Sequence, residues 1–133
     1  MHCGLRYCST SVKGVLEGVV MSLRQTMEKL IGPVNRDASI VLIGGGTRPG
    51  VWCQMAVDVW GVSVHVPEQA QYLPAMGAAS LEFVHLGWCE NLETFNERVI
   101  KNRPNHVYDP CSAATQIYEQ RYGKFLQLYV KDE

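Results

Sequence analysis

Apolar residues recur at steps of three and four along residues 9–31, which predicts an amphipathic helix. The apolar stripe consists of Val12, Val15, Leu16, Val19, Leu23, Met27 and Leu30. A serine or threonine at positions 9–11 can cap the start of this helix by accepting a backbone N–H bond. Gly32 and Pro33 end it, because glycine tolerates the left-handed exit and proline cannot continue a helix.

Two glycines lie within this predicted helix. Gly14 and Gly18 are four residues apart, so they share one face of the helix. Each lowers the helix propensity. We interpret them as a face that packs closely against a neighbouring element.

A run of apolar residues over 38–43 predicts a strand. Its sequence, A-S-I-V-L-I, is rich in β-branched residues, as expected for a strand buried on both faces. The strand leads directly into a glycine-rich stretch at 44–50. Residues 51–60 then predict a helix, and a short strand is expected over 62–66.

The second half of the chain is mainly helical in pattern. Helices are predicted over residues 74–87, 92–100 and 111–130, with a proline-marked loop over 103–110. The first of these helices carries small side chains that would let it lie close to another element: Ala75, Gly77, Ala78 and Ala79. Two strands make a poor sheet by themselves. Either further strands lie within the loops, or this chain is part of a larger sheet.

Composition limits the classes of function. The chain has 133 residues, 47% of them hydrophobic, with 12 basic and 13 acidic side chains. This size and apolar content predict one folded domain, and the charge balance argues against a nucleic-acid surface. No apolar run reaches the length of a membrane span, and the N-terminus lacks a signal-peptide pattern. A cytoplasmic protein is therefore expected.

The cysteines and histidines do not predict a metal site. The five cysteines lack C-x-x-C spacing, and the four histidines lack H-x-x-x-H or H-E-x-x-H spacing. We interpret the cysteines as reduced thiols that serve as small apolar residues.

The glycine turn at 44–46 is the segment with the most chemical character. Glycines let a backbone approach a ligand closely, and the N-terminus of the following helix offers unpaired N–H groups. The turn also follows the carboxyl end of a strand, where open α/β sheets bind ligands. However, it matches neither the Rossmann nor the Walker A pattern. The residues alone leave two readings open, a phosphate or nucleotide site and a plain turn.

Three ordered motifs resemble those of the FGGY carbohydrate kinases. The stretch from Ile43 to Asp58 reads I-G-G-G-T-R-P-G-V-W-C-Q-M-A-V-D and is similar to the family signature G-G-G-A-x-S-x-x-W-x-Q-x-x-A-D. Residues 15–24 resemble the A-V-L-E-G-V-A-x-x-L-R helix, and residues 75–79, A-M-G-A-A, resemble the A-L-G-A-A segment. The tail, with Tyr108-x-Pro110 followed by Tyr118 and Tyr122, resembles the closing stretch of the family. The xylulokinase-like branch is the most similar.

The resemblance implies an α/β fold with few strands and several packed helices, as part of the C-terminal ribonuclease-H-like (actin-like ATPase) domain. Residues 1–133 are then a single partial domain on the nucleotide side of the kinase. Members use ATP and Mg²⁺ to phosphorylate a sugar, here a xylulose-like pentulose. The nucleotide-binding residues implied are Gly44, Gly45, Gly46 and Thr47, through their backbone, with Arg48 as a further charge for phosphate. Glu17, Gln54 and Asp58 are interpreted as structural.

The resemblance also indicates what this chain lacks. The phosphate loop, the sugar pocket and the catalytic aspartate of the family fall outside it, so no catalytic residue is assigned and no turnover is expected from the chain alone. Pro49 stands where the family usually has serine or asparagine, which removes a polar side chain and an N–H donor from the turn. In the tail, the aromatic stripe with Tyr118 and Tyr122 is interpreted as packing surface.

Two alternative functions remain. The chain could be a non-catalytic interaction or oligomerisation module, either a truncated paralogue or a piece that self-associates or pairs with a missing lobe. The deficit of strands and the apolar helix with small residues support this alternative, because exposed apolar patches usually bind a partner. It could also be a stand-alone Rossmann-like binder of another nucleotide. That alternative lacks the acidic ribose residue about 20 positions after the glycines, although Glu68 lies near enough to keep it open.

Overall fold

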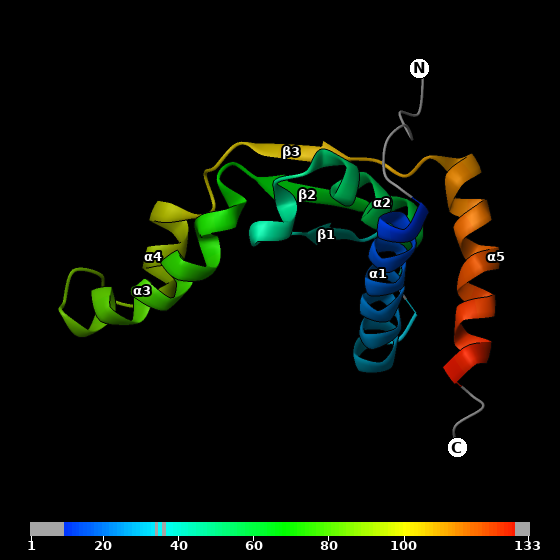
Figure 1. The fold of residues 1–133 in the computed structure, drawn as a ribbon. Helices are drawn as coiled ribbons and strands as arrows, with labels where there is room; N and C mark the ends of the chain where they lie inside the picture. The colour runs from blue at the N-terminus through cyan, green and yellow to red at the C-terminus, as the bar shows by residue number, and fades with distance from the viewer. Residues whose placement is uncertain (1–9, 34, 36, 130–133) are drawn as a thin grey trace.

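The computed structural model describes residues 10–33, 35 and 37–129. Over these residues the chain forms five α-helices, three strands and two short 3₁₀ turns, arranged as an elongated molecule with the sheet at its centre (Figure 1). The helices are α1 (Thr10–Ile31), α2 (Gly50–Trp60), α3 (Leu73–His85), α4 (Leu92–Val99) and α5 (Ser112–Tyr129). The strands are β1 (Ser39–Val41), β2 (Ser63–Pro67) and β3 (Asn105–Tyr108), and the turns are η1 (Gly45–Thr47) and η2 (Ala70–Tyr72).

The sheet is mixed and has the order β1-β2-β3. β1 runs parallel to β2, with Val41 opposite His65, and β2 runs antiparallel to β3, with His65 opposite Val107. β3 lies in the segment predicted as a loop, so that prediction was wrong. The sequence analysis left two ways to complete the sheet, and a further strand within a loop was one of them. β3 escapes the sequence pattern because three of its four residues are exposed, which leaves no apolar alternation to recognise.

Helices α1, α2 and α5 pack together at one end of the sheet. The buried core gathers residues from α1, α2, β2 and α5, with α2 contributing the most. Tyr118 and Tyr122 of α5 are buried in this core, at 5% and 4% exposure, which confirms the aromatic stripe as packing surface. α1 ends at Ile31, and Gly32 adopts a φ of 82°, as the sequence predicted. The candidate caps at positions 9–11 fall at or beyond the edge of the described residues and stay a prediction.

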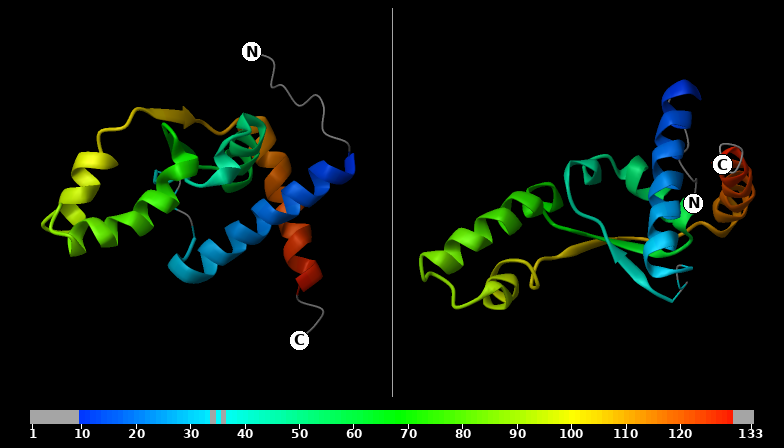
Figure 2. Two further views of the ribbon diagram at one scale, coloured as in Figure 1. Left: turned by 60° about the vertical axis from the view of Figure 1, so that its left-hand side comes forward. Right: turned by 90° about the horizontal axis from the view of Figure 1, so that it is seen from below.

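Helices α3 and α4 form an arm that projects from the other end of the sheet (Figure 2). Phe83 holds the arm together through edge-to-face contacts with Trp88 and Phe95, at ring-centroid distances of 5.1 and 5.5 Å. The small residues of α3 are exposed over the described part of the chain, so their close approach to another element stays a prediction.

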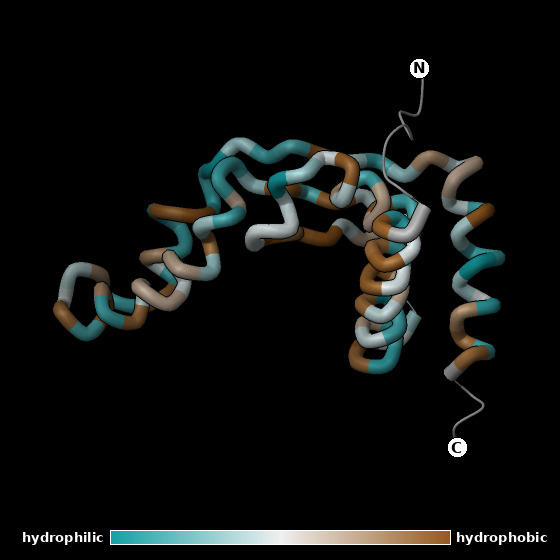
Figure 3. The backbone as a smooth tube through the Cα atoms, in the orientation of Figure 1, coloured by the Kyte–Doolittle hydropathy of each residue, from teal (hydrophilic) through white to brown (hydrophobic). Residues whose placement is uncertain are grey.

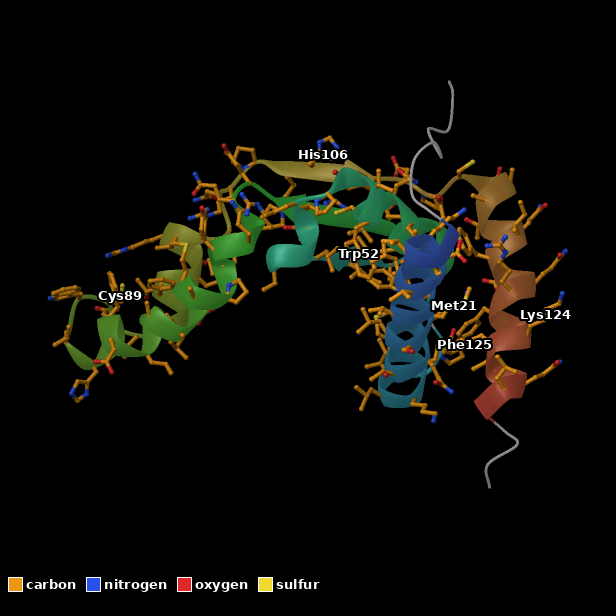
Figure 4. All side chains as sticks on the ribbon, in the orientation of Figure 1. Met21, Trp52, Cys89, His106, Lys124 and Phe125 are labelled. Atoms are coloured by element: carbon orange, nitrogen blue, oxygen red, sulfur yellow. The ribbon has the colours of Figure 1, made fainter. Side chains whose placement is uncertain are left out.

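Two packing predictions were wrong. β1 is not buried on both faces, because Val41 is 61% exposed while Ile40 packs against the core. Gly14 and Gly18 do not contact a neighbouring helix: a Cβ at either position would meet nothing within 4 Å. They line a groove of about 330 Å³ between α1 and α5, where Met21 and Phe125 lie between the helices (Figure 4).

Along the described residues, none of the helices combines the length and the apolar character needed to cross a bilayer.

Candidate functional site

The glycine turn joins β1 to α2 and is tied to the neighbouring η2 turn. Gly44 donates its N–H to the carbonyl of Ala70 at 2.9 Å. The chain then enters η1, whose first internal hydrogen bond runs from the N–H of Thr47 to the carbonyl of Gly44 at 3.1 Å. The N–H groups of Gly45 and Gly46 precede that bond, so the turn offers two backbone donors to a ligand.

The three glycines differ in backbone conformation and surroundings. Gly44 has a φ of 102°, which other L-residues rarely adopt. Gly45 has an ordinary φ, and a Cβ there would meet nothing within 4 Å, so open space lies beside its backbone. A Cβ at Gly46 would lie 3.2 Å from the indole nitrogen of Trp52, which is packed against the core. The Trp52 ring (Figure 4) would therefore have to shift by a few tenths of an ångström to accommodate a side chain at position 46.

Thr47 and Arg48 have opposite environments. The Thr47 side chain is buried and donates its hydroxyl to the Gly44 carbonyl at 2.7 Å, so it closes the turn. Arg48 is exposed, directly before the start of α2. Pro49 occupies the N-cap of α2 without a side-chain cap, as expected from its missing polar group. The structure thus brings all five predicted residues, from Gly44 to Arg48, to one turn.

Behind the turn, α2 is fixed by buried groups. The Cys53 thiol is fully buried and donates to the carbonyl of Thr47 at 3.5 Å. Burial raises the pKa of the Cys53 thiol, although a hydrogen bond with Tyr108 lowers it. The Tyr108 hydroxyl lies 3.3 Å from where a Cβ of Gly50 would be. Tyr108 therefore connects β3 to the base of the glycine turn.

Gln54 and Asp58 of the signature are structural, in agreement with the sequence interpretation. Asp58 is 4% exposed and accepts hydrogen bonds from the backbone N–H of Cys111 at 2.8 Å and from Gln54 at 3.2 Å. Gln54 also donates to the carbonyl of Asp109 at 3.0 Å. Together they attach the connection between β3 and α5 to α2.

Glu17 is also structural, as expected. Its carboxylate accepts hydrogen bonds from the Tyr118 hydroxyl at 3.0 Å and from Arg121 at 2.9 Å, which connects α1 to α5.

Arg24 connects three helices, and the sequence argument assigned it no role. Its guanidinium donates to the Val59 carbonyl at 2.7 Å, bonds Glu28 and Glu119, and lies over the Tyr122 ring at 4.1 Å. The one sequence feature that could have pointed to Arg24 is its position at the end of the motif over residues 15–24.

A cleft lies beside the turn, on the side of η2 and β3. It has a volume of about 430 Å³. Its lining consists of Thr47, residues 66–71 at and after the end of β2, Pro104, and residues of β3 that include His106 and Tyr108. Glu68 is exposed at its rim, and its backbone N–H donates to the carbonyl of Pro104 at 2.8 Å. The glycine turn is therefore open beside Gly45 and flanked by a cleft of mixed polar and apolar lining.

These features define an α/β domain of the actin-like, ribonuclease-H-like class, with a glycine turn between a strand and a helix. Residues 9–86 match the FGGY family of carbohydrate kinases, C-terminal domain. The chain belongs to this family. That assignment replaces the Rossmann-like alternative.

Known relatives agree with the family and show how much of a kinase this chain represents. A xylulose kinase of Staphylococcus epidermidis is 30% identical over 117 residues, which cover 88% of this chain and 23% of that protein. A ligand-bound xylulose kinase from Lactobacillus acidophilus has a similar fold, with a TM-score of 0.64 at 19% identity, over 89% of this chain and 23% of that one. A gluconate kinase from the same organism gives 0.66 at 18% identity over the same shares. The chain therefore spans about a quarter of the length of these relatives.

Proposed function

We propose that this chain forms the nucleotide-side wall of an ATP-dependent carbohydrate kinase that phosphorylates a hydroxyl group of a xylulose-like pentulose. The open glycine turn at the end of β1 carries the proposal, because it combines free backbone donors with space beside Gly45. Membership of the carbohydrate kinase family supports ATP as the nucleotide. The S. epidermidis xylulose kinase supports a pentulose as the acceptor.

In this proposal the chain binds and orients the nucleotide through its backbone. The N–H groups of Gly45 and Gly46 donate to the ligand, and Thr47 holds the turn closed through its bond to Gly44. Arg48, exposed before α2, supplies a positive charge for phosphate together with the positive end of the helix dipole. ATP provides the γ-phosphoryl group, whose bond to the β-phosphate oxygen breaks as a bond to the sugar oxygen forms.

The remaining catalytic groups are assigned to the rest of the kinase. Among the described residues, no group of three or more carboxylate, histidine or cysteine side chains could hold a metal ion. We assign no catalytic base to this chain, because none of its aspartates matches the family's catalytic position. We expect no sugar phosphorylation by the chain alone, since alignment of two substrates requires both walls of the site.

The experiment that tests this proposal is calorimetric titration of ATP into the chain and into two glycine variants. Gly45→Val places a side chain in the open space beside the turn and should weaken ATP binding about tenfold or more, ~1.4 kcal/mol. Gly123→Ala on α5, where a Cβ also meets nothing within 4 Å, is the matched control and should bind like the parent chain. Failure of the parent chain to bind millimolar ATP, or equal binding by Gly45→Val, would contradict the proposal.

The alternative of a non-catalytic interaction module is not favoured, because the relatives named above are all kinases. Self-association of the chain is a separate property, which sizing in solution would measure.

A further inference from the structure

The arm formed by α3 and α4 joins the sheet at a junction of two chain segments. One segment is residues 68–69, directly after β2, and the other is residues 103–104, between α4 and β3. The N–H of Glu68 donates to the carbonyl of Pro104 at 2.8 Å, which ties the two segments together. Figure 3 shows both segments mainly in teal, so the junction consists mostly of hydrophilic residues. Its geometry therefore depends on hydrogen bonds more than on apolar packing.

The Arg103 side chain connects three parts of this junction. Its Nε donates to the carbonyl of Val99, the last residue of α4, at 2.8 Å, and its Nη1 donates to the carbonyl of Glu68 at 3.1 Å. Its Nη2 lies 3.4 Å from the sulfur of Met76 in α3. The side chain is half-buried. Glu68 is therefore held on both sides, through its N–H by Pro104 and through its carbonyl by Arg103.

The residue after Glu68 has a backbone conformation that needs such support. Gln69 has a φ of 58° and a ψ of 32°, and it is the one non-glycine residue with a positive φ in the part of the chain that the structure describes. This left-handed conformation is unfavourable for glutamine and persists where the surrounding structure fixes it. The two bonds to Glu68 fix the chain directly before Gln69.

The residue after Gln69 is bonded to the glycine turn. Ala70 begins η2 and is 1% exposed, and its carbonyl accepts the N–H of Gly44 at 2.9 Å. Gly44 in turn precedes the two proposed backbone donors, the N–H groups of Gly45 and Gly46. A short series of covalent and hydrogen bonds therefore leads from the arm to the proposed nucleotide site.

We propose that Arg103 is a positioning residue for the nucleotide site. By holding Glu68 it fixes η2, and η2 fixes the glycine turn through the bond between Ala70 and Gly44. Without Arg103, the backbone at Gln69 can relax toward an ordinary conformation, and the Ala70 carbonyl moves away from Gly44. The nucleotide affinity then falls, because the turn has to be ordered when the ligand binds. The inference rests on the proposed function, since the turn is the proposed site of the nucleotide.

The experiment combines calorimetric titration of ATP with amide hydrogen exchange in the chain and its variants. Arg103→Met keeps an unbranched side chain but removes every donor. Arg103→Lys keeps the charge and a single donor group, and it is the milder change if the methionine variant does not fold. Arg98→Met, at an exposed arginine in the last turn of α4, is the matched control.

We expect Arg103→Met to weaken ATP binding about three- to tenfold and to speed the exchange of the Gly44 amide about tenfold or more. Arg103→Lys should change both in the same direction by less, and Arg98→Met should behave like the parent chain. A merely structural role of Arg103 would loosen the arm and speed exchange in α4 alone. Unchanged exchange at Gly44 and unchanged ATP affinity would therefore overturn the proposal.

A second substitution tests the route through η2. Asparagine adopts the left-handed conformation more readily than glutamine does. Adding Gln69→Asn to Arg103→Met should therefore restore the protection of the Gly44 amide about threefold, with Gln69→Asn alone as the reference. Equal loss of protection with and without Gln69→Asn would overturn this route.

The two proposals fail separately. Loss of Gly44 protection in Arg103→Met, in a parent chain that does not bind ATP, would contradict the proposed function and leave the positioning of the turn by Arg103 standing. ATP binding by the parent chain and equally by Arg103→Met, with the Gly44 amide protected in both, would contradict the role of Arg103 alone.

Discussion

Asp58 on α2 accepts a hydrogen bond of 2.8 Å from the backbone N–H of Cys111, 53 positions further along the chain. The carboxylate is almost fully buried. Burial raises its pKa, although the bonds from Cys111 and Gln54 act in the opposite direction. The pair therefore attaches the start of α5 to α2 at the cost of a buried negative charge.

Replacing Asp58 separates the hydrogen bond from the charge. Asp58→Ala leaves the Cys111 N–H without its partner and should lower the free energy of unfolding by about 1–3 kcal/mol. Asp58→Asn keeps an acceptor oxygen without the charge and should cost less. Urea unfolding of both variants at pH 7 measures the two effects. Equal losses would show that the charge, and not the acceptor, matters.

The same position predicts a pH dependence. A folded-state pKa above the ordinary value near 3.8 means that the folded state binds the proton more tightly. The associated stability is present below pH 3.8 and is lost as the pH rises through the raised pKa. In unfolding curves between pH 3.5 and pH 7, the stability that Asp58→Asn loses relative to the parent chain should therefore become smaller as the pH rises. A constant difference would contradict the raised pKa.

Glu28 gives the opposite pH dependence. Burial would raise its pKa, but hydrogen bonds from Tyr122, at 2.6 Å, and Arg24 outweigh burial and lower it below the ordinary value near 4.5. The stability from this group is present above pH 4.5 and is lost as the pH falls through the lowered pKa. Tyr122→Phe should cost about 0.5–1.5 kcal/mol at pH 7 and reduce the loss on acidification. A steeper acid loss in the variant would contradict the role of this bond.

Much of the fold could be predicted because its signals are local. Apolar periodicity, small apolar residues and Pro74 predicted the five helices that the described residues form, and Gly32 marked the end of α1. The strand in residues 105–108 could not be predicted, because its exposed residues carry no alternation and its pairing depends on β2. The prediction that β1 is buried on both faces was wrong for a related reason. Its apolar side chains are suited to a sheet wider than the described residues form.

Part of the candidate site could also be predicted from the sequence, and part could not. The turn from Gly44 to Arg48 could be located from the motif, since its residues are consecutive in the sequence. The connections behind it could not, because the partners of Arg24 and Asp58 lie far away in sequence. Glu119 is 95 positions from Arg24, and no spacing rule relates the two.

Replacing Gly14 or Gly18 by alanine should stabilise the folded chain. Both lie inside α1, and a Cβ at either position meets nothing within 4 Å. Alanine should therefore raise the free energy of unfolding by about 0.8–1 kcal/mol per site through helix propensity. Gly32→Ala is the contrasting change, because its φ of 82° should make alanine destabilising. Thermal unfolding followed by circular dichroism checks all three, and a loss at Gly14 or Gly18 would contradict the open groove.

Cys53 should resist thiol reagents in the folded chain. It is fully buried and burial raises its pKa, so little thiolate is available, whereas Cys89 and Cys111 are partly exposed. Timed alkylation followed by peptide mass spectrometry should label Cys89 and Cys111 well before Cys53. Urea should remove the difference. Early labelling of Cys53 in the native chain would mean that the base of the glycine turn opens.

The Thr47 hydroxyl should affect nucleotide binding through the turn that it closes. Its hydroxyl bonds the Gly44 carbonyl at 2.7 Å, which holds the two ends of the turn together. Thr47→Val keeps the shape but removes this bond, so ATP affinity should fall about three- to tenfold as the turn loses its fixed geometry. Thr47→Ser keeps the hydroxyl and should restore most of the affinity. Calorimetry measures both, and equal affinities for the valine and serine variants would show that the hydroxyl does not position the turn.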